Sequence, residues 1–130
     1  LFVTVGADQL WEVEFNVAAS SGASSTVDLK FAINVPAGST GRVFMLGLDS
    51  TATSVVEDMF PISRTDLTDS GFGIAGVVAS SDPTWLHMKA IVKTGGTSGD
   101  IILRFAQGTS SGTSITVLSG SYLKACRFVE

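Results

Sequence analysis

Hydrophobic and polar residues alternate along much of the chain with a period of two, which is the pattern of β-strands with one buried face. Residues 10–18 and 26–35 show it most clearly. In the first run the apolar positions are Trp11, Val13, Phe15 and Val17. In the second run they are Val27, Leu29, Phe31, Ile33 and Val35. Both runs therefore predict amphipathic strands that pack one face on a core.

Shorter apolar runs separated by Gly, Ser, Thr, Asp and Pro predict further strands and turns. They cover residues 1–5, 42–48, 72–80, 85–93, 100–106, 114–118 and 121–129. Residues 49–70 are the least regular, with a short helix around Ser54 to Met59 as one interpretation. Many short strands with polar turns predict an all-β fold, an antiparallel β-sandwich of jelly-roll type with about nine strands and little helix.

The alternation also predicts which side chains form the core. The expected core consists of Trp11, Val13, Phe15, Leu29, Phe31, Ile33, Leu103 and Phe105. The single cysteine, Cys126, is expected to be a small core residue, since a free thiol in a strand packs like a hydrophobe. Residues 100–106 are apolar on both faces, although a two-layer sandwich buries only one face of each strand. The second face predicts contact with another protein chain.

Composition strengthens this expectation of assembly. The 130 residues suit a single domain over 1–130, and the start at Leu1 without Met fits the C-terminal part of a longer chain. Only 15% of residues are charged and mean hydropathy is +0.40, yet no segment approaches the length of a membrane span. Oligomerisation would hide the apolar surface. The net charge of -4 and scattered basic residues argue against nucleic acid and anionic membranes as partners.

Two segments match the residue pattern of a catalytic or cofactor-binding motif, but the secondary structure predicted around them differs from what each motif requires. Gly71 to Gly76 reads G-x-G-x-x-G, but strand-forming valines follow it where the dinucleotide fingerprint needs a helix. Gly108 to Gly112 reads G-x-S-x-G around Ser110, in an expected hairpin loop, and His87 is the one candidate base. We expect a strand histidine and a loop serine, and no enzyme activity; a serine hydrolase is the alternative from a different class.

Metal binding and sugar stacking have weaker support. Asp66 and Asp69, with Glu57 and Asp58 upstream, could offer oxygens to a hard cation, but their spacing fits no EF-hand loop. One Cys and one His do not make a zinc site. We therefore expect no metal or organic cofactor. Trp85 begins a strand and is a candidate for partial exposure at a rim, an interface or a sugar-binding surface.

The stretch LRFAQGTSSGTSITVLSGSYLKACRF, Leu103 to Phe128, resembles the C-terminal end of a group of tailed-bacteriophage virion domains. In these, a strand ending in Ala-Gln leads to a Thr/Ser-rich turn, a T-V-L-x-G-S-Y-L run and a final strand with Arg. The early LWEVEFNV strand also fits their opening, and the resemblance covers about a quarter of the chain well. Such domains are similar to trimeric jelly rolls of the TNF and C1q type.

The resemblance implies a non-enzymatic structural protein located in the virion, most simply a trimeric capsid decoration (cement) or head-fibre protein. Its partners would be copies of itself and other virion proteins such as the major capsid protein. A tail-fibre module that binds a host receptor or surface glycan is the alternative. The expected interface residues are Phe105, Tyr122, Arg104, Arg127 and Trp85, with Glu12 or Glu14 of a neighbouring subunit accepting hydrogen bonds from the two arginines.

Overall fold

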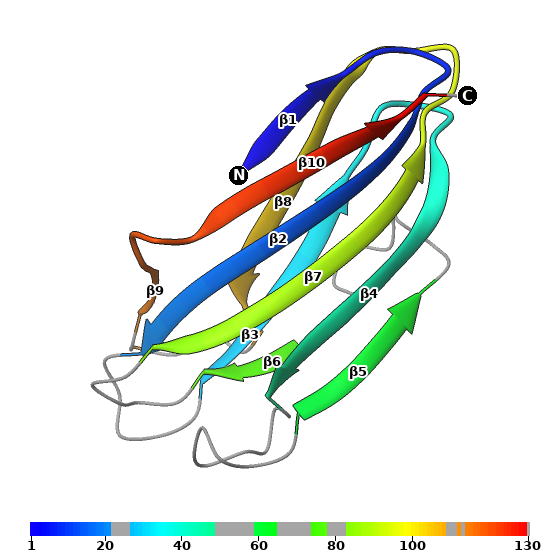
Figure 1. Ribbon diagram of the computed structural model, residues 1–130. Helices are drawn as coiled ribbons and strands as arrows, with labels where there is room; N and C mark the ends of the chain where they lie inside the picture. The colour runs from blue at the N-terminus through cyan, green and yellow to red at the C-terminus, as the bar shows by residue number, and fades with distance from the viewer. Residues whose placement is uncertain are drawn as a thin grey trace.

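The computed structural model describes residues 1–21, 27–48, 59–64, 74–77, 83–108, 112 and 114–129. These residues form two antiparallel β-sheets that lie face to face (Figure 1). The four-stranded sheet has the order β1 (Phe2–Val5), β8 (Gly99–Gln107), β3 (Val27–Asn34) and β6 (Ile74–Val77). The six-stranded sheet has the order β10 (Tyr122–Phe128), β2 (Leu10–Ser21), β7 (Thr84–Lys93), β4 (Thr40–Leu48) and β5 (Met59–Arg64), and β9 (Ile115–Val117) also pairs with β2.

The predicted all-β antiparallel sandwich is confirmed. The chain changes sheet at most of its connections, from β2 to β3 and back to β4, while β4 and β5 are neighbours within one sheet. Strand β5 lies in a segment for which no strand was predicted. Its sequence, MFPISR, contains Pro61, which is tolerated because β5 is an edge strand. Met59 therefore belongs to a strand and not to the expected helix, whose other residues lie outside the described ranges.

The core lies between the sheets and comes from alternate positions of the long strands. In β2 and β7 the period-two pattern holds over many residues, so that every second side chain is buried. Six predicted core residues are confirmed as buried: Val13, Phe15, Leu29, Phe31, Ile33 and Leu103. Val17, Val43, Met45, Leu86, Met88, Ala90, Val92 and Ile101 complete most of this cluster. No helix occurs in the described ranges, and hence none there that is long and apolar enough to cross a membrane.

Three residues expected in the core lie elsewhere. Phe105 is 50% exposed, because the sandwich is open at the end of β8. Cys126 is exposed, since it lies on β10, an edge strand, in register with Glu12 on the outer face. Trp11 is half-buried at the margin of the core, where its Nε1–H donates to Gln9 Oε1 at 3.0 Å.

The edge of the six-stranded sheet beside β2 is made of two short strands in line. β10 pairs with β2 over Leu10 to Asn16, and β9 pairs with it over Ala19 to Ser21. Between them the chain turns through Gly120, whose φ of 97° is unfavourable for residues with a Cβ. Ser121 holds this turn against β2, since its Oγ accepts a hydrogen bond from Ala18 N (3.0 Å) and donates one to Leu118 O (2.9 Å).

Candidate interaction surface

Large apolar side chains are exposed along one side of the sandwich, which we call the open side. It is formed by β1 and the end of β8 in one sheet and by β9 and β10 in the other (Figure 1). Its exposed apolar residues are Leu1, Phe2, Phe105, Tyr122, Phe128 and Val129. Phe2 lies on the outer face of the four-stranded sheet and Tyr122 and Phe128 on that of the six-stranded sheet, so these side chains border the open side from both faces. Exposed apolar surface on a small domain is a candidate interaction site.

On the open side, β1 pairs with only part of β8. β1 pairs with β8 from Gly99 to Ile102, and the Leu103 N–H donates to Leu1 O at 3.0 Å. Beyond Leu103, β8 pairs with β3 on its other side but with no described strand on this side. Phe105 occupies an inward-facing position, because it lies opposite the buried Phe31. None of the described strands pairs with β8 beside Phe105 on this side, and its ring is 50% exposed.

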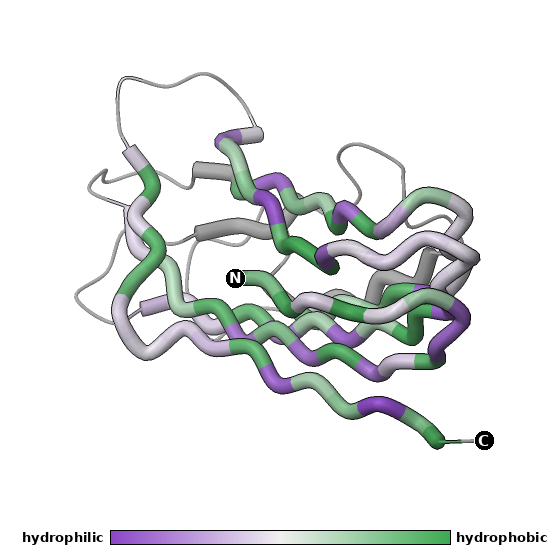
Figure 2. The backbone as a smooth tube through the Cα atoms, turned by 90° about the horizontal axis from the view of Figure 1, so that it is seen from above, coloured by the Kyte–Doolittle hydropathy of each residue, from purple (hydrophilic) through white to green (hydrophobic). Residues whose placement is uncertain are grey.

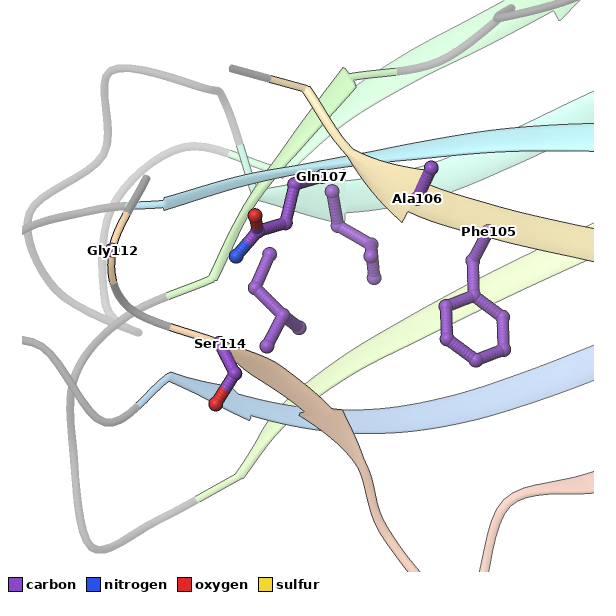
Figure 3. A pocket seen from close by; sticks show the side chains of 7 residues that line it. Phe105, Ala106, Gln107, Gly112 and Ser114 are labelled. Atoms are coloured by element: carbon purple, nitrogen blue, oxygen red, sulfur yellow. The ribbon is translucent and has the colours of Figure 1, made fainter. Parts of the chain in front are cut away.

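A cavity of about 370 Å³ lies beside Phe105, between the end of β8 and the start of β9 (Figure 3). Its lining residues are Leu29, Phe105, Ala106, Gln107, Gly112, Ser114 and Ile115. Figure 3 shows Phe105 and Gln107 extending from β8, with Ser114 across the cavity from them. The described lining residues are apolar or neutral and polar, and none of them is charged, so this part of the cavity suits an apolar side chain better than an ion.

β10 alternates polar and apolar residues but buries neither set fully. Figure 2 shows this alternation along the strand that leads to the C-terminus. Leu123 and Ala125 face inward and are partly buried against the core, while Tyr122 and Phe128 lie on the outer face. At the end of β10, Arg127, Phe128 and Val129 border a second cavity of about 490 Å³ together with Asp8, Gln9, Leu10 and Lys93. The strand therefore presents an edge and two half-exposed faces.

The outer face of the six-stranded sheet carries a second aromatic group. Tyr122, Asn16 and His87 lie in one row across β10, β2 and β7, and Trp85 lies two residues from His87 on β7. His87 Nδ1 lies 3.0 Å from Asn16 Oδ1, so the imidazole donates to the amide oxygen. Trp85 and Tyr122 are 54% and 51% exposed. With strands ~4.8 Å apart and ~3.4 Å per residue, the two aromatic positions are about 12 Å apart.

Charged residues on this same face pair with one another. Lys89 Nζ lies 2.8 Å from Glu12 Oε2 and 3.9 Å from Glu14 Oε1. The hydrogen bond that Lys89 donates to Glu12 raises the pKa of Lys89 above its ordinary value, with smaller Coulombic contributions from Glu12 and Glu14 and an opposing effect of desolvation. Both carboxylates thus already have a partner in the chain, which weakens their expected role as acceptors for Arg104 and Arg127 of a neighbouring subunit.

The structure does not bring all five predicted interface residues together. Phe105 and Arg127 lie on the open side, Tyr122 lies where the open side meets the outer face of the six-stranded sheet, and Trp85 lies further along that face. Arg104 lies on the outer face of the four-stranded sheet, opposite Ala32. Arg104 and Arg127 are both exposed in the single chain. Their contacts in an assembly remain a prediction.

Sequence reasoning missed Phe2, Phe128 and Phe44 as exposed aromatic residues. The alternation predicts on which face of a strand each ring lies. It does not predict that β1 and β10, from opposite ends of the chain, both lie at the open side. The signal that could have found Phe2 and Phe128 is their position in edge strands near the termini. Phe44, on the outer face of β4, is 41% exposed and lies away from the open side.

The sequence motifs that resemble catalytic or metal-binding sites form no such site among the described residues. His87 lies on β7 and contacts Asn16, while Ser110, Asp66 and Asp69 are outside the described ranges, as are Glu57, Asp58 and Gly71 to Gly73. Ile74 to Gly76 belong to strand β6, as the strand interpretation of that motif predicts. The described residues contain no group of three or more His, Cys, Asp or Glu side chains placed to hold a metal ion.

Comparisons with protein-family models, with curated proteins and with solved structures find no match to this chain.

Proposed function

We propose that this chain is a non-enzymatic structural domain that assembles with copies of itself through the open side. The observation that carries the proposal is the gathering of exposed aromatic and aliphatic residues on β1, β8 and β10, next to strand edges that no described strand covers. Buried aromatic side chains contribute much of the free energy of protein association. Uncovered edges add backbone hydrogen-bonding groups that favour pairing with another chain.

A virion role as a trimeric capsid decoration or head-fibre protein rests on the resemblance of Leu103 to Phe128. This stretch includes the second half of β8 and all of β9 and β10, which together form much of the open side. In such an assembly the open sides of three copies would meet around an axis, with the outer faces left for other virion proteins such as the major capsid protein. The domain would then be found in the virion.

A specific observation favours a second candidate, a receptor- or glycan-binding module of a tail fibre. Trp85 and Tyr122 are exposed on the outer face with the hydrogen-bonded His87 and Asn16 between them. Aromatic faces stack on the apolar faces of sugar rings, and neighbouring polar groups can bond to hydroxyls. A glycan array separates the candidates: selective binding that Trp85→Ala abolishes supports the module, and no binding supports the structural role.

Self-association is tested by light scattering after size-exclusion chromatography at micromolar concentration. We expect a mass near a multiple of 13.5 kDa, three times for the trimer. Phe105→Asp and Phe128→Asp should lower the oligomer population, because each places a charge on the open side. Phe44→Asp is the matched control, since Phe44 is an exposed aromatic residue on a strand away from that side. A soluble monomer at all concentrations would overturn the proposal, and a dimer would overturn the trimer alone.

A further inference from the structure

We propose that the outer face of β4 and β7 binds an acidic, apolar segment of a different protein. The site, which we call the β4–β7 patch, consists of outward side chains of the two strands: Arg42, Phe44 and Leu46 of β4, and Ile91 and Lys93 of β7. A carboxylate of the partner would lie between the two cations, and its apolar side chains would cover the rest. The patch lies away from the open side, so this partner is distinct from the copies that the open side would bind.

The alternation along β4 and β7 turns these five side chains outward. The residues between and beside them, Val43, Met45, Ala90 and Val92, are buried in the core between the sheets. Successive side chains of a strand point to opposite faces, so the patch lies on the outer face. Figure 1 shows that each strand has a neighbour on both sides, β2 and β4 for β7, and β7 and β5 for β4. A partner on this face therefore contacts side chains and not a free strand edge.

The apolar part of the patch is continuous with its cations. Phe44 is 41% exposed, and Leu46 and Ile91 are half-buried. Phe44 and Leu46 are two residues apart on β4, which places them about 7 Å apart on one face. Ile91 lies directly opposite Arg42. The arrangement is an apolar area with charge at one end, as in interfaces that have an apolar centre and a polar rim.

Two like charges lie close together at that end. Arg42 and Lys93 are both exposed. Because Arg42 is opposite Ile91 and Lys93 is two residues further along β7, the two cations are diagonal neighbours, about 7–8 Å apart. Their side chains are long enough to reach one anion together. A carboxylate placed between them would replace a repulsion with two charge-assisted hydrogen bonds.

The carboxylates of the same face are already engaged. Lys89 Nζ lies 2.8 Å from Glu12 Oε2 and 3.9 Å from Glu14 Oε1. If two copies met through this face, the described residues would bring four cations from the two patches together and no free carboxylate. Charged groups that lose water without gaining a partner oppose association. An acidic segment of a different protein supplies the missing charge.

A polypeptide fits the patch better than a sugar or a free anion does. The five side chains include no neutral polar group that could bond to sugar hydroxyls. A free anion would use the two cations and leave Phe44 and Leu46 in water. In an extended polypeptide, every second side chain faces the same way at intervals of about 7 Å, which matches the spacing of Arg42, Phe44 and Leu46 along β4.

The first test is a peptide titration followed by two-dimensional NMR. The probe is acetyl-Glu-Ser-Glu-Ser-Leu-Ser-Leu-amide, whose alternate residues are acidic in one half and apolar in the other. We expect shift changes centred on the amides of Arg42, Phe44 and Lys93. Replacing both Glu by Lys should weaken binding about fivefold or more, because two attractions become repulsions. Sodium sulfate at equal ionic strength tests for a simple anion and should leave the Leu46 methyl signals unchanged.

Variants of the protein separate the two parts of the patch. Arg42→Glu should weaken binding of the Glu peptide and strengthen binding of the Lys peptide, since it reverses the charge at one end. Phe44→Ser should weaken both peptides by a similar factor, because it removes apolar contact and leaves the charges in place. Trp85→Ala is the matched control: Trp85 is an exposed aromatic residue on the same face of β7, outside the patch, so neither affinity should change.

A tethered version keeps the test decisive if the free peptide binds weakly. Phe128, Leu10 and Lys93 lie in one row across β10, β2 and β7, so the end of β10 is about 10 Å from Lys93. A linker of twelve Gly and Ser residues after Glu130 spans about 20 Å on average and holds the probe at high effective concentration. We expect the tethered Glu peptide to shift the same amides, and the tethered Lys peptide to leave them largely unchanged.

Four results would overturn the proposal. One is the absence of shifts on β4 and β7 with both the free and the tethered Glu peptide. Another is equal shifts from the Glu and Lys peptides. The third is loss of binding in Trp85→Ala, which would move the site to the second aromatic group. The fourth is a lower oligomer mass for Phe44→Asp, which would mean that a second copy covers the patch. Self-association is read from the mass of the unmodified protein, so either proposal can fail without the other.

Discussion

Phe31 and Phe105 lie directly opposite each other on β3 and β8, yet Phe31 is 1% exposed and Phe105 is 50% exposed. Both rings take inward positions, so the strand pattern treats them alike. They differ in what packs on them: Phe31 belongs to the core cluster between the sheets, whereas Phe105 lines the cavity between the end of β8 and the start of β9. The face of the sheet alone thus does not decide which of the two rings is in the core.

The two rings should therefore respond differently to truncation. Phe31→Ala should lower the free energy of unfolding by about 3–5 kcal/mol, because it leaves a cavity in a packed core. Phe105→Ala should cost about 1 kcal/mol or less, since half of the ring is already in water. Denaturant melts at equal, low protein concentration measure both. Equal costs in the two variants would show that Phe105 is covered in solution.

A buried hydroxyl ties β7 to the start of β2. Thr94 Oγ1 accepts a hydrogen bond from Gln9 N at 2.8 Å and donates to Gly6 O at 2.8 Å, and the residue is buried. Thr94→Val keeps the shape but leaves the Gln9 N–H without this acceptor, so we expect a loss of about 1–3 kcal/mol. Thr116→Val, at an exposed position on β9, is the control and should be nearly neutral. A neutral Thr94→Val in urea melts would contradict the assignment.

The Lys89–Glu12 pair predicts a pH dependence at alkaline pH. The pKa of Lys89 is raised in the folded chain, so the stabilisation is fully present below the ordinary lysine pKa of 10.5 and is lost as pH rises through the raised value. Glu12→Gln should lower the pKa of Lys89 toward its ordinary value, as followed by NMR titration of its side chain. Glu14→Gln should lower it less, since Glu14 is 3.9 Å away and Glu12 is 2.8 Å away. The reverse order would show that the pairing differs in solution.

The reactivity of the Cys126 thiol measures how accessible the outer face of β10 is to solvent. We expect a thiol-reactive chromophore to label it in the native protein without denaturant, because Cys126 lies on the exposed outer face of an edge strand. Slow labelling even in a dilute, monomeric sample would mean that Cys126 is buried, as the sequence had suggested.

The long strands could be predicted from sequence because their alternation is strict and extends over many residues. In β2 the polar and apolar positions follow each other without a break from Trp11 to Val17, so the buried face was predicted correctly. β5 lacked this signal, because Pro61 interrupts a short strand at an edge. A period of two thus identifies the long strands, and it loses a short strand that a proline interrupts.

The candidate surface was less accessible to sequence reasoning, for a related reason. Alternation predicts the face of the sheet on which Phe105 and Cys126 lie. The exposure of Phe105 depends on how much of β8 pairs with β1, and that of Cys126 depends on β10 being an edge strand. Both facts are pairings between segments far apart in the chain. The partial exposure expected of Trp85 is confirmed, and the interface role of Trp85 and Tyr122 stays a prediction. Their common face follows from the register of β10, β2 and β7.

The two sides of the sandwich differ in how readily they could support polymerisation. The side opposite the open side ends in β6 of the four-stranded sheet and in β5 of the six-stranded sheet. In β5, Pro61 lacks an N–H and so discourages a further strand from joining. β1, β8 and β10 contain no proline. Within the six-stranded sheet, a further strand is thus opposed at β5 and not at β10. Copies that pair through β10 would leave the proline-bearing edge outermost, which would oppose growth of this sheet into a fibre.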